Sequence, residues 1–207
     1  MSTDRRDFKM IFPTVVHQSL VDGHDELNAQ LQAEIDEIRD NTPNGRPASW
    51  SCDVYTTISN NCDLHERPGF KRLKAHFIES AEQYARAMSY SLDRYFVDMD
   101  MCWLNIYNES HAQERHTHIN YPIGGCYYMK APEGSAPITI HSPSADKAKR
   151  PVLTEKNSNN SHFHDFEPKE GMMLIFGGKV RHSVRVSTCS EERISIAMNA
   201  YLTPRDR

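Results

Sequence analysis

Residues 97–107, with the sequence VDMDMCWLNIY, decide the fold class that we expect for this chain. In an extended strand, side chains two positions apart point to the same face of a sheet. The residues that share one face here are Val97, Met99, Met101, Trp103 and Asn105. This period of two predicts a strand with a mostly apolar face, and it contrasts with the helical spacing of apolar residues earlier in the chain.

Short runs of β-type sequence follow this stretch toward the C-terminus. They are GGCYYMK (124–130), ITIH (138–141), HFHDF (162–166), MMLIF (172–176), HSVRV (182–186) and RISIAMNAY (193–201). Clusters of Pro, Gly, Asn and Ser separate the runs, as turn residues do between strands. Many short strands divided by turns predict a sandwich, a barrel or a jelly roll.

Two stretches before this β region have the spacing of amphipathic helices. Residues 25–39 begin with Asp25 as the expected N-cap, and residues 69–88 follow a proline that suits a helix start. Between them, residues 40–66 predict a loop and one strand. Helices that precede a run of strands predict an α+β fold in which the helices support one sheet.

The length of 207 residues, without a repeat or a linker, predicts a single domain over residues 1–207. Within it, residues 1–94 are expected to give helical support and to shape the pocket, and residues 95–207 to form the β core. A net charge of −4 argues against nucleic-acid binding through bulk charge. No apolar run is long enough for a membrane span or a signal peptide. Five cysteines without CxxC spacing fit a reducing compartment, so we expect a cytoplasmic protein.

Histidines are concentrated in the β region, where seven of the eleven fall between His111 and His182. His116 and His118 lie two residues apart, so on an extended chain both imidazoles would converge on one point, as metal ligands do. His182 stands alone at the start of a later expected strand. These residues are the candidate metal ligands.

A second polar feature lies on the last expected strand. Arg193 and Ser195 share a face with Ala197 and Asn199, whereas Ile194, Ile196 and Met198 form the other face. A buried arginine without a partner is costly, and a carboxylate ligand would satisfy it through a forked hydrogen bond. The pair Arg193 and Ser195 therefore predicts a site for a carboxylate.

The order HxH, a distant His, then Arg-x-Ser ten residues later resembles the iron(II)/2-oxoglutarate dioxygenases. The chain resembles more closely a branch of these oxygenases found in bacteria and phages. The residues that carry the resemblance are FP (12–13), WLNIY (103–107), HTH (116–118), GGCYYMKAP (124–132), GMMLIFGG (171–178), His182 and ERISIAMN (192–199).

The resemblance implies a double-stranded β-helix, or jelly-roll core, with the N-terminal helices as support. It places the HxH pair on the second core strand, the distal His on the seventh and the Arg on the eighth, which agrees with four strand-like runs between His118 and His182. It implies Fe(II) on His116, His118 and His182, and the far carboxylate of 2-oxoglutarate on Arg193 and Ser195. It further implies the use of O2, hydroxylation of a C–H bond, and release of succinate and CO2.

Position 118 departs from the larger superfamily, in which most members have Asp or Glu there. Three neutral imidazoles would leave an Fe(II) site one unit more positive, which favours dianionic 2-oxoglutarate but also admits zinc or copper. Alternatively, water or a carboxylate such as Glu114 takes the position of His118. The pair His162 and His164 competes as a ligand set, but only one strand-like run separates it from His182, so we expect a polar strand edge there.

Several other residues near these motifs are expected to lie in or beside the site. Asn105 and Asn199 are expected to hydrogen-bond beside the site, with Asn105 a candidate for contact with the co-substrate. Trp103 and Phe176 are expected in the core. One of three tyrosines after the HxH pair could reach the co-substrate carboxylate, and parity does not choose among Tyr121, Tyr127 and Tyr128.

Two other functions fit the same residues. A cupin-like dioxygenase with three His ligands would use no 2-oxoglutarate, and a jelly-roll binding module with a zinc-filled site would consume no oxygen. The expected partner is a small molecule, an amino acid or a peptide, and neither nucleic acid nor membrane. The sequence is compatible with a homodimer.

Overall fold

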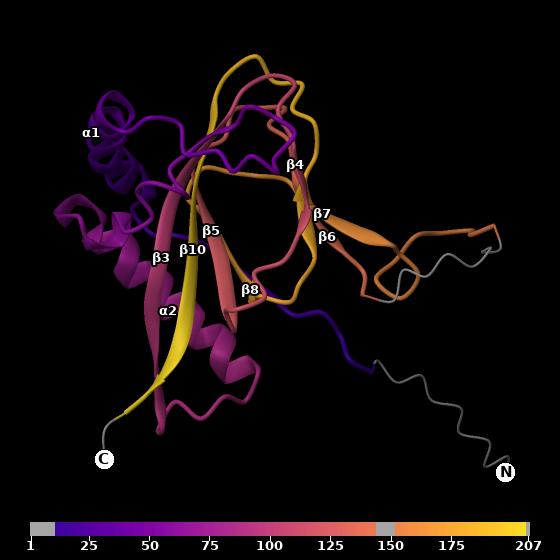
Figure 1. Cartoon of the computed structure of the whole chain (residues 1–207). Coiled ribbons are helices and arrows are strands. Elements are labelled where there is room, and N and C mark those ends of the chain that lie inside the picture. The colour runs from indigo at the N-terminus through magenta and orange to yellow at the C-terminus, as the bar shows by residue number, and fades with distance from the viewer. Residues whose placement is uncertain (1–10, 144–151, 206–207) are drawn as a thin grey trace, which may run out of the picture.

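The computed structural model describes residues 11–143 and 152–205, and its core consists of two antiparallel sheets that face each other (Figure 1). The elements are β1 (Val16–Leu20), α1 (His24–Asn41), β2 (Tyr55–Thr56), α2 (Lys71–Ala87), β3 (Tyr95–Tyr107), β4 (Gln113–His116), β5 (Ile123–Lys130), β6 (Ile138–His141), β7 (Phe163–Phe166), β8 (Met172–Gly177), β9 (His182–Val184) and β10 (Arg193–Pro204). Two short 3-10 turns, Leu64–Glu66 and Pro68–Phe70, precede α2.

The strand order is that of a jelly roll. One sheet has six strands in the order β1-β8-β5-β10-β3-β2, and the other has four in the order β4-β9-β6-β7. From β3 onward the chain passes back and forth between the two sheets, so strands that are distant in sequence become neighbours. This arrangement confirms the predicted α+β fold with a double-stranded β-helix core.

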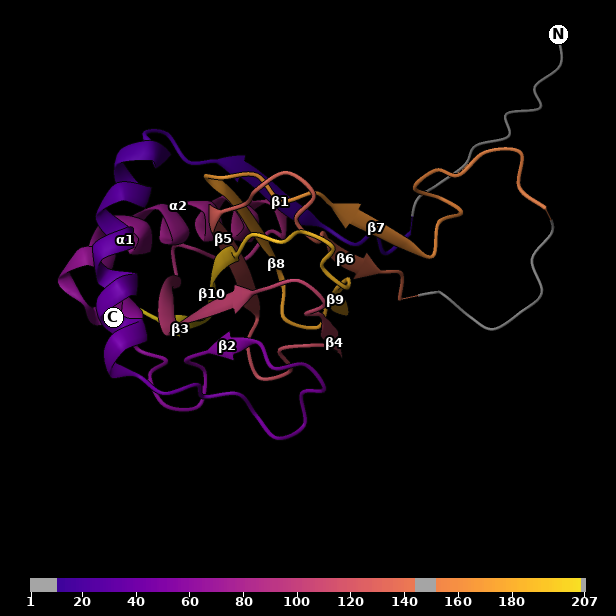
Figure 2. The same cartoon turned by 90° about the horizontal axis from the view of Figure 1, so that it is seen from above.

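The helices α1 and α2 lie on the outer face of the six-stranded sheet (Figure 2). Each helix buries one apolar stripe, as the sequence spacing predicts. The stripes consist of Leu27, Leu31, Ile35 and Ile38 in α1 and of Leu73, Phe77, Ala81 and Tyr84 in α2. They share one core with Ile194, Ile196 and Met198 of β10, so this side of the sheet serves stability and leaves the inner side free.

The expected N-cap of the first helix is wrong by two residues. The helix begins at His24 after Gly23, which has a positive φ of 64°. A glycine adopts this left-handed conformation without steric cost. Asp25 lies instead in the first turn, where its charge is favourable near the positive end of the helix dipole.

The first 94 residues also contribute two edge strands to the six-stranded sheet. β1 pairs with β8, and β2 pairs with β3. The strand in 40–66 was expected, whereas β1, with the mixed sequence VHQSL, was not. Neither helix has the length and apolarity to cross a bilayer, and the same holds for every helix in the described ranges.

A bulge in β3 corrects the expected face of this strand. Met101 pairs with Asn199 and Met99 pairs with Ala200, so Asp100 is an extra residue between two consecutive pairs. An extra residue reverses the alternation of side chains on either side of it. Met101 therefore faces the space between the sheets, together with Trp103 and Asn105, whereas Met99 and Val97 pack in the core beneath the helices.

Candidate metal and co-substrate site

A cavity of about 480 Å³ lies between the two sheets. The six-stranded sheet contributes side chains of β3, β5, β8 and β10, and the four-stranded sheet contributes side chains of β4, β6 and β9. The four residues of β10 that face the cavity are Arg193, Ser195, Ala197 and Asn199, the same face that the sequence predicts. The three expected metal ligands, His116, His118 and His182, and the expected carboxylate-binding pair, Arg193 and Ser195, all line this cavity.

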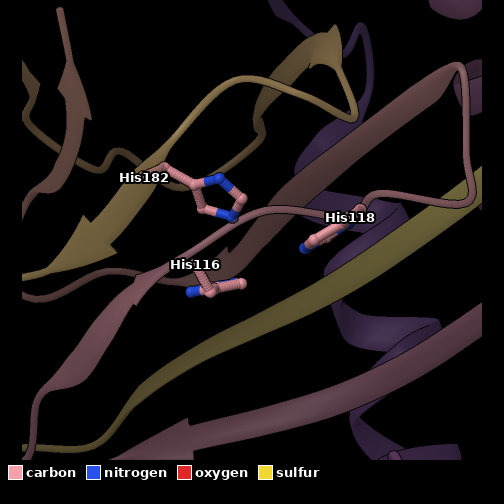
Figure 3. Close-up of side chains that lie close together, drawn as sticks. All are labelled: His116, His118 and His182. Carbon is pink, nitrogen blue, oxygen red and sulfur yellow. The ribbon is translucent and has the colours of Figure 1, made fainter. Parts of the chain in front are cut away.

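Three imidazoles meet at one place in this cavity (Figure 3). His116, His118 and His182 each offer a ring nitrogen, and these nitrogens lie within 4.8 Å of one another. The ring centroids are 4.2 Å apart for His116 and His182, 5.0 Å for His118 and His182, and 5.4 Å for His116 and His118. No other group of this kind occurs among the residues that the structure describes.

Of the pair His116 and His118, only His116 lies within a paired strand. β4 ends at His116, which is the register partner of His182 on β9. His118 lies beyond the strand, where its backbone N–H donates to the carbonyl of Gly178 at 2.7 Å. The two imidazoles converge, as expected, and His118 stands at the start of a turn in which the N–H of Tyr121 donates to the His118 carbonyl at 3.0 Å.

The hydrogen bonds of the three rings leave the same nitrogen free on each. Nδ1 of His116 lies 2.8 Å from the carbonyl of Glu114, and Nδ1 of His182 lies 2.9 Å from that of Val180. Nδ1 of His118 lies 2.5 Å from Oδ1 of Asn199. A carbonyl oxygen only accepts, so each Nδ1 donates a proton and each Nε2 keeps its lone pair. Histidines that bind a metal typically donate the N–H of the other ring nitrogen to a neighbouring acceptor in the same way.

Burial keeps these imidazoles neutral. It lowers the pKa of His182 to about 3, with a further contribution from the neighbouring His116 and His118. It lowers the pKa of His118 to about 4, although the hydrogen bond that His118 donates to Asn199 acts in the opposite direction, and it also lowers the pKa of His116. At neutral pH the three rings therefore present lone pairs without first having to lose protons.

Two glycines of the quoted motifs make room for His118. A Cβ on Gly124 would lie 3.1 Å from Nδ1 of His118 and 3.3 Å from Oδ1 of Asn199. A Cβ on Gly178 would lie 2.4 Å from the carbonyl oxygen of His118, which no real contact allows. The absence of side chains at these positions lets the turn around His118 approach β5 and β9 closely.

Arg193 forms the inner end of the cavity and is only 3% exposed. Its Nη1 donates to the carbonyl of Ala136 at 2.9 Å, and its Nη2 lies 3.4 Å from Oγ of Ser195. The guanidinium stacks over the ring of Tyr107 at 4.3 Å and lies 5.2 Å from that of Tyr128. No carboxylate pairs with it in the described residues, and its Nε has no hydrogen-bond partner there.

Of the three tyrosines considered, only Tyr128 reaches Arg193. Its hydroxyl is buried beside the Cys126 thiol and has no nitrogen or oxygen partner among the described residues. The hydroxyl of Tyr127 donates to Asn28, and that of Tyr121 donates to Asp100. A buried arginine and a buried phenol, each with an unused donor, fit a carboxylate, and a carboxylate is what 2-oxoglutarate offers at its far end.

Asn105 and the two aromatic residues also face the cavity. The Asn105 amide donates to Oγ1 of Thr56 at 2.8 Å and accepts from Nε1 of Trp103 at 3.2 Å. Trp103 lies 5.8 Å from His118, and Phe176 lies 4.8 Å from His182, between ring centroids. Both residues are buried, as expected, and Phe176 belongs to a hydrophobic core cluster, but both also line the cavity.

The competing ligands lie elsewhere. His162 and His164 are exposed at β7, the edge strand of the four-stranded sheet, and the ring of His164 packs against Phe166. The Glu114 carboxylate accepts a hydrogen bond from the backbone N–H of Ser51. Neither the second histidine pair nor Glu114 lines the cavity.

The same fold occurs in solved structures. A prolyl-4-hydroxylase from Pseudomonas putida has a TM-score of 0.61 at 14% identity, and the match covers 93% of this chain and 94% of that protein. HygX from Streptomyces hygroscopicus, with nickel, 2-oxoglutarate and hygromycin B bound, has a TM-score of 0.59 at 12% identity, over 90% and 83% of the two chains. The epimerase SnoN, in complex with Fe3+, alpha ketoglutarate and nogalamycin RO, has a TM-score of 0.64 at 14% identity, over 91% and 78%.

At these identities the likeness shows a shared fold. The comparison with curated proteins gives no sequence match. Residues 101–199 match the family described as "Putative 2OG-Fe(II) oxygenase". This segment contains the three histidines, Arg193 and Ser195, so the site residues lie in the part of the chain that is similar to this oxygenase family.

Proposed function

We propose that the chain is an Fe(II)- and 2-oxoglutarate-dependent dioxygenase that hydroxylates a C–H bond and releases succinate and CO2. The observation that carries the proposal is that one cavity contains both three imidazoles with free Nε2 atoms and a buried arginine without a carboxylate partner. Iron with bound 2-oxoglutarate supplies the activation of O2, and the chain supplies position, orientation and a dry environment.

In this proposal His116, His118 and His182 hold Fe(II) through Nε2. Three protein ligands leave positions open for a chelating co-substrate and for oxygen. All three ligands are neutral, so the site keeps the full charge of the ion, which favours the dianion of 2-oxoglutarate. Asn199 fixes the tautomer and the orientation of His118, the ligand that lies outside a strand.

Arg193, Ser195 and Tyr128 bind the far carboxylate of 2-oxoglutarate. The planar guanidinium suits two parallel hydrogen bonds to a carboxylate, and the two hydroxyls add donors. Tyr107 holds the guanidinium from one face, and the Ala136 carbonyl anchors it from the edge. Asn105 acts beside them by fixing the indole of Trp103.

The substrate in this proposal is a small molecule, an amino acid or a peptide. Solved proteins of the same fold bind hygromycin B and nogalamycin RO, which supports a small molecule. Residues 1–94 support the sheet and, through Trp50 and Ile58, shape the pocket within one domain. Five free thiols support a location in the reducing cytoplasm.

Anaerobic reconstitution with Fe(II), followed by an optical titration with 2-oxoglutarate, tests the proposal. A charge-transfer band that develops with 2-oxoglutarate, together with succinate formed after admission of air, is the expected result. Arg193→Leu is the matched control, because it should lose the band while it retains iron. Iron binding without any response to 2-oxoglutarate would contradict the proposal.

A second candidate is a dioxygenase that uses three His ligands and no 2-oxoglutarate. The absence of a carboxylate among the three clustered groups favours it. Succinate separates the two reactions, since this alternative forms none. A binding module with zinc in the same place would consume no oxygen with any co-substrate.

A further inference from the structure

The charges around the cavity are distributed unevenly. Arg193 is the only lining residue among the described ones that carries a permanent charge, and no Asp, Glu or Lys lines the cavity. The proposed function, on which this inference rests, assigns Arg193 to 2-oxoglutarate. A substrate in the remaining space therefore meets no charged side chain of either sign.

The walls near the histidines and toward the opening are mainly apolar. They are formed by Ile58, Met101, Trp103, Ile119 and Tyr121. Met101 and Trp103 face the cavity because of the bulge at Asp100, and Trp103 lies beside His118. Ile119 is 77% exposed although it lines the cavity, so an apolar side chain stands at the opening.

The polar end of Tyr121 is used outside the cavity. Its hydroxyl donates to Asp100 at 2.5 Å, and its ring packs against Tyr201 with centroids 4.8 Å apart. Asp100, which accepts this bond, is exposed to solvent and does not line the cavity. A charged group that entered here would lose water and, with Arg193 occupied by 2-oxoglutarate, would find no side chain of opposite charge along this wall, which is unfavourable.

We propose that the substrate inserts an uncharged, largely apolar group, aromatic or aliphatic, between Met101, Trp103 and Tyr121, and that its charges stay outside the opening. A free amino acid fully inside the cavity does not fit, because its ammonium and its carboxylate would both lack partners. An apolar group gains from leaving water, and rings of the size of indole and phenol offer it broad contact.

Binding of isosteric probes tests this proposal. The chain is loaded with Ni(II) and saturating 2-oxoglutarate, so that Arg193 is occupied. The probes are 4-methylbenzamide against 4-methylbenzoate, and 4-methylbenzyl alcohol against 4-methylbenzylammonium. Both tryptophans of the chain, Trp50 and Trp103, line the cavity, so tryptophan fluorescence reports binding there. Each neutral probe should bind at least tenfold more tightly than its charged partner.

A variant pair sharpens the test. Met101→Lys should bind 4-methylbenzoate more tightly than 4-methylbenzamide, which reverses the preference of the wild type. Met101→Leu should still prefer the neutral 4-methylbenzamide. Equal or tighter binding of the charged probes to the wild type overturns the proposal, and so does binding of none. An unchanged preference in a folded Met101→Lys protein also overturns it.

The same samples separate this inference from the proposed function. If 2-oxoglutarate fails to bind, the proposed function is wrong. The alcohol and ammonium pair then decides the inference alone, because neither probe uses Arg193. A preference for the alcohol without 2-oxoglutarate binding would uphold the apolar site and reject the dioxygenase.

Discussion

His118 and Asn199, which are 81 positions apart in the chain, are joined by a hydrogen bond of 2.5 Å from Nδ1 of the imidazole to Oδ1 of the amide. The bond connects the turn after β4 with the cavity face of β10. The two other imidazoles of the cluster, those of His116 and His182, donate hydrogen bonds from Nδ1 to backbone carbonyls two residues away in their own segments. His118 is thus the one imidazole of the three whose orientation depends on a side chain from another strand.

Asn199→Leu should weaken binding of Fe(II) or Ni(II) by about 10- to 100-fold, the typical effect of losing a group that orients a metal ligand. Asn199→Asp should bind the metal at least as well as the wild type, because a carboxylate also accepts from Nδ1. Competition with a chelator measures both affinities, and thermal unfolding shows whether the folds are intact. A Leu variant that binds metal like the wild type would remove the proposed role of Asn199.

His118→Ala should weaken Fe(II) binding by about tenfold or more, since the site loses one of its proposed ligands. His118→Asp should recover part of the affinity, because carboxylates are ligands for iron. The double variant His162→Ala with His164→Ala is the control and should bind iron like the wild type. Full iron binding and intact 2-oxoglutarate turnover in His118→Ala would show that His118 is not a ligand.

Arg193→Leu should weaken 2-oxoglutarate binding by about 30-fold to several-thousand-fold, which corresponds to about 2–5 kcal/mol for a lost partner of a buried charge. Arg193→Lys should be milder, because an ammonium keeps the charge but loses the fork. Tyr128→Phe removes one hydrogen bond to the charged carboxylate and should cost about 1.5–3 kcal/mol, or about 13- to 160-fold. Titration of the iron-loaded variants gives the three affinities, and an Arg193→Leu protein that matches the wild type would disprove the assignment.

The metal-free chain should lose stability as the pH falls below about 6.5. His182 has an ordinary pKa of 6.5 when unfolded and about 3 when folded, so the unfolded chain binds more protons between these values. Stability is therefore complete above 6.5 and declines as the pH falls toward 3. From pH 7 to pH 5 the contribution of His182 alone is about 2 kcal/mol.

Urea unfolding of the metal-free protein at the two pH values measures this loss. His182→Gln cannot protonate in this range, so the variant should show a smaller pH dependence than the wild type. Equal pH dependence in both proteins would mean that His182 is not buried as a neutral group.

Much of the fold follows from local pattern. The period of two in β10 separates Arg193 and Ser195 from the apolar residues between them, and the structure has the same division. The turn residues between runs likewise mark the strands, because Gly and Pro interrupt them for steric reasons. Both patterns depend only on residues that are close in the sequence, so the strands and their two faces can be predicted from a single sequence.

What the sequence could not predict depends on register between distant strands. Asp100 looks like any residue of an alternating strand, and only its pairing with β10 shows that it is an extra residue. Tyr128 is selected over Tyr127 because it pairs with Ser195 and faces the cavity, which requires the alignment of β5 with β10. The approach of His118 to Asn199 arises in the same way.

The division of β10 into two faces has a consequence for how this gene can change. Substitutions at Ile194, Ile196 or Met198 affect the packing beneath the helices, and those at Arg193 or Ser195 affect the pocket. An inserted codon after Ser195 would exchange the two faces for the rest of the strand, because side chains alternate with a period of two. Insertions and deletions in this segment should therefore be lost from any library selected for folding, whereas point changes on the pocket face alone could survive that selection.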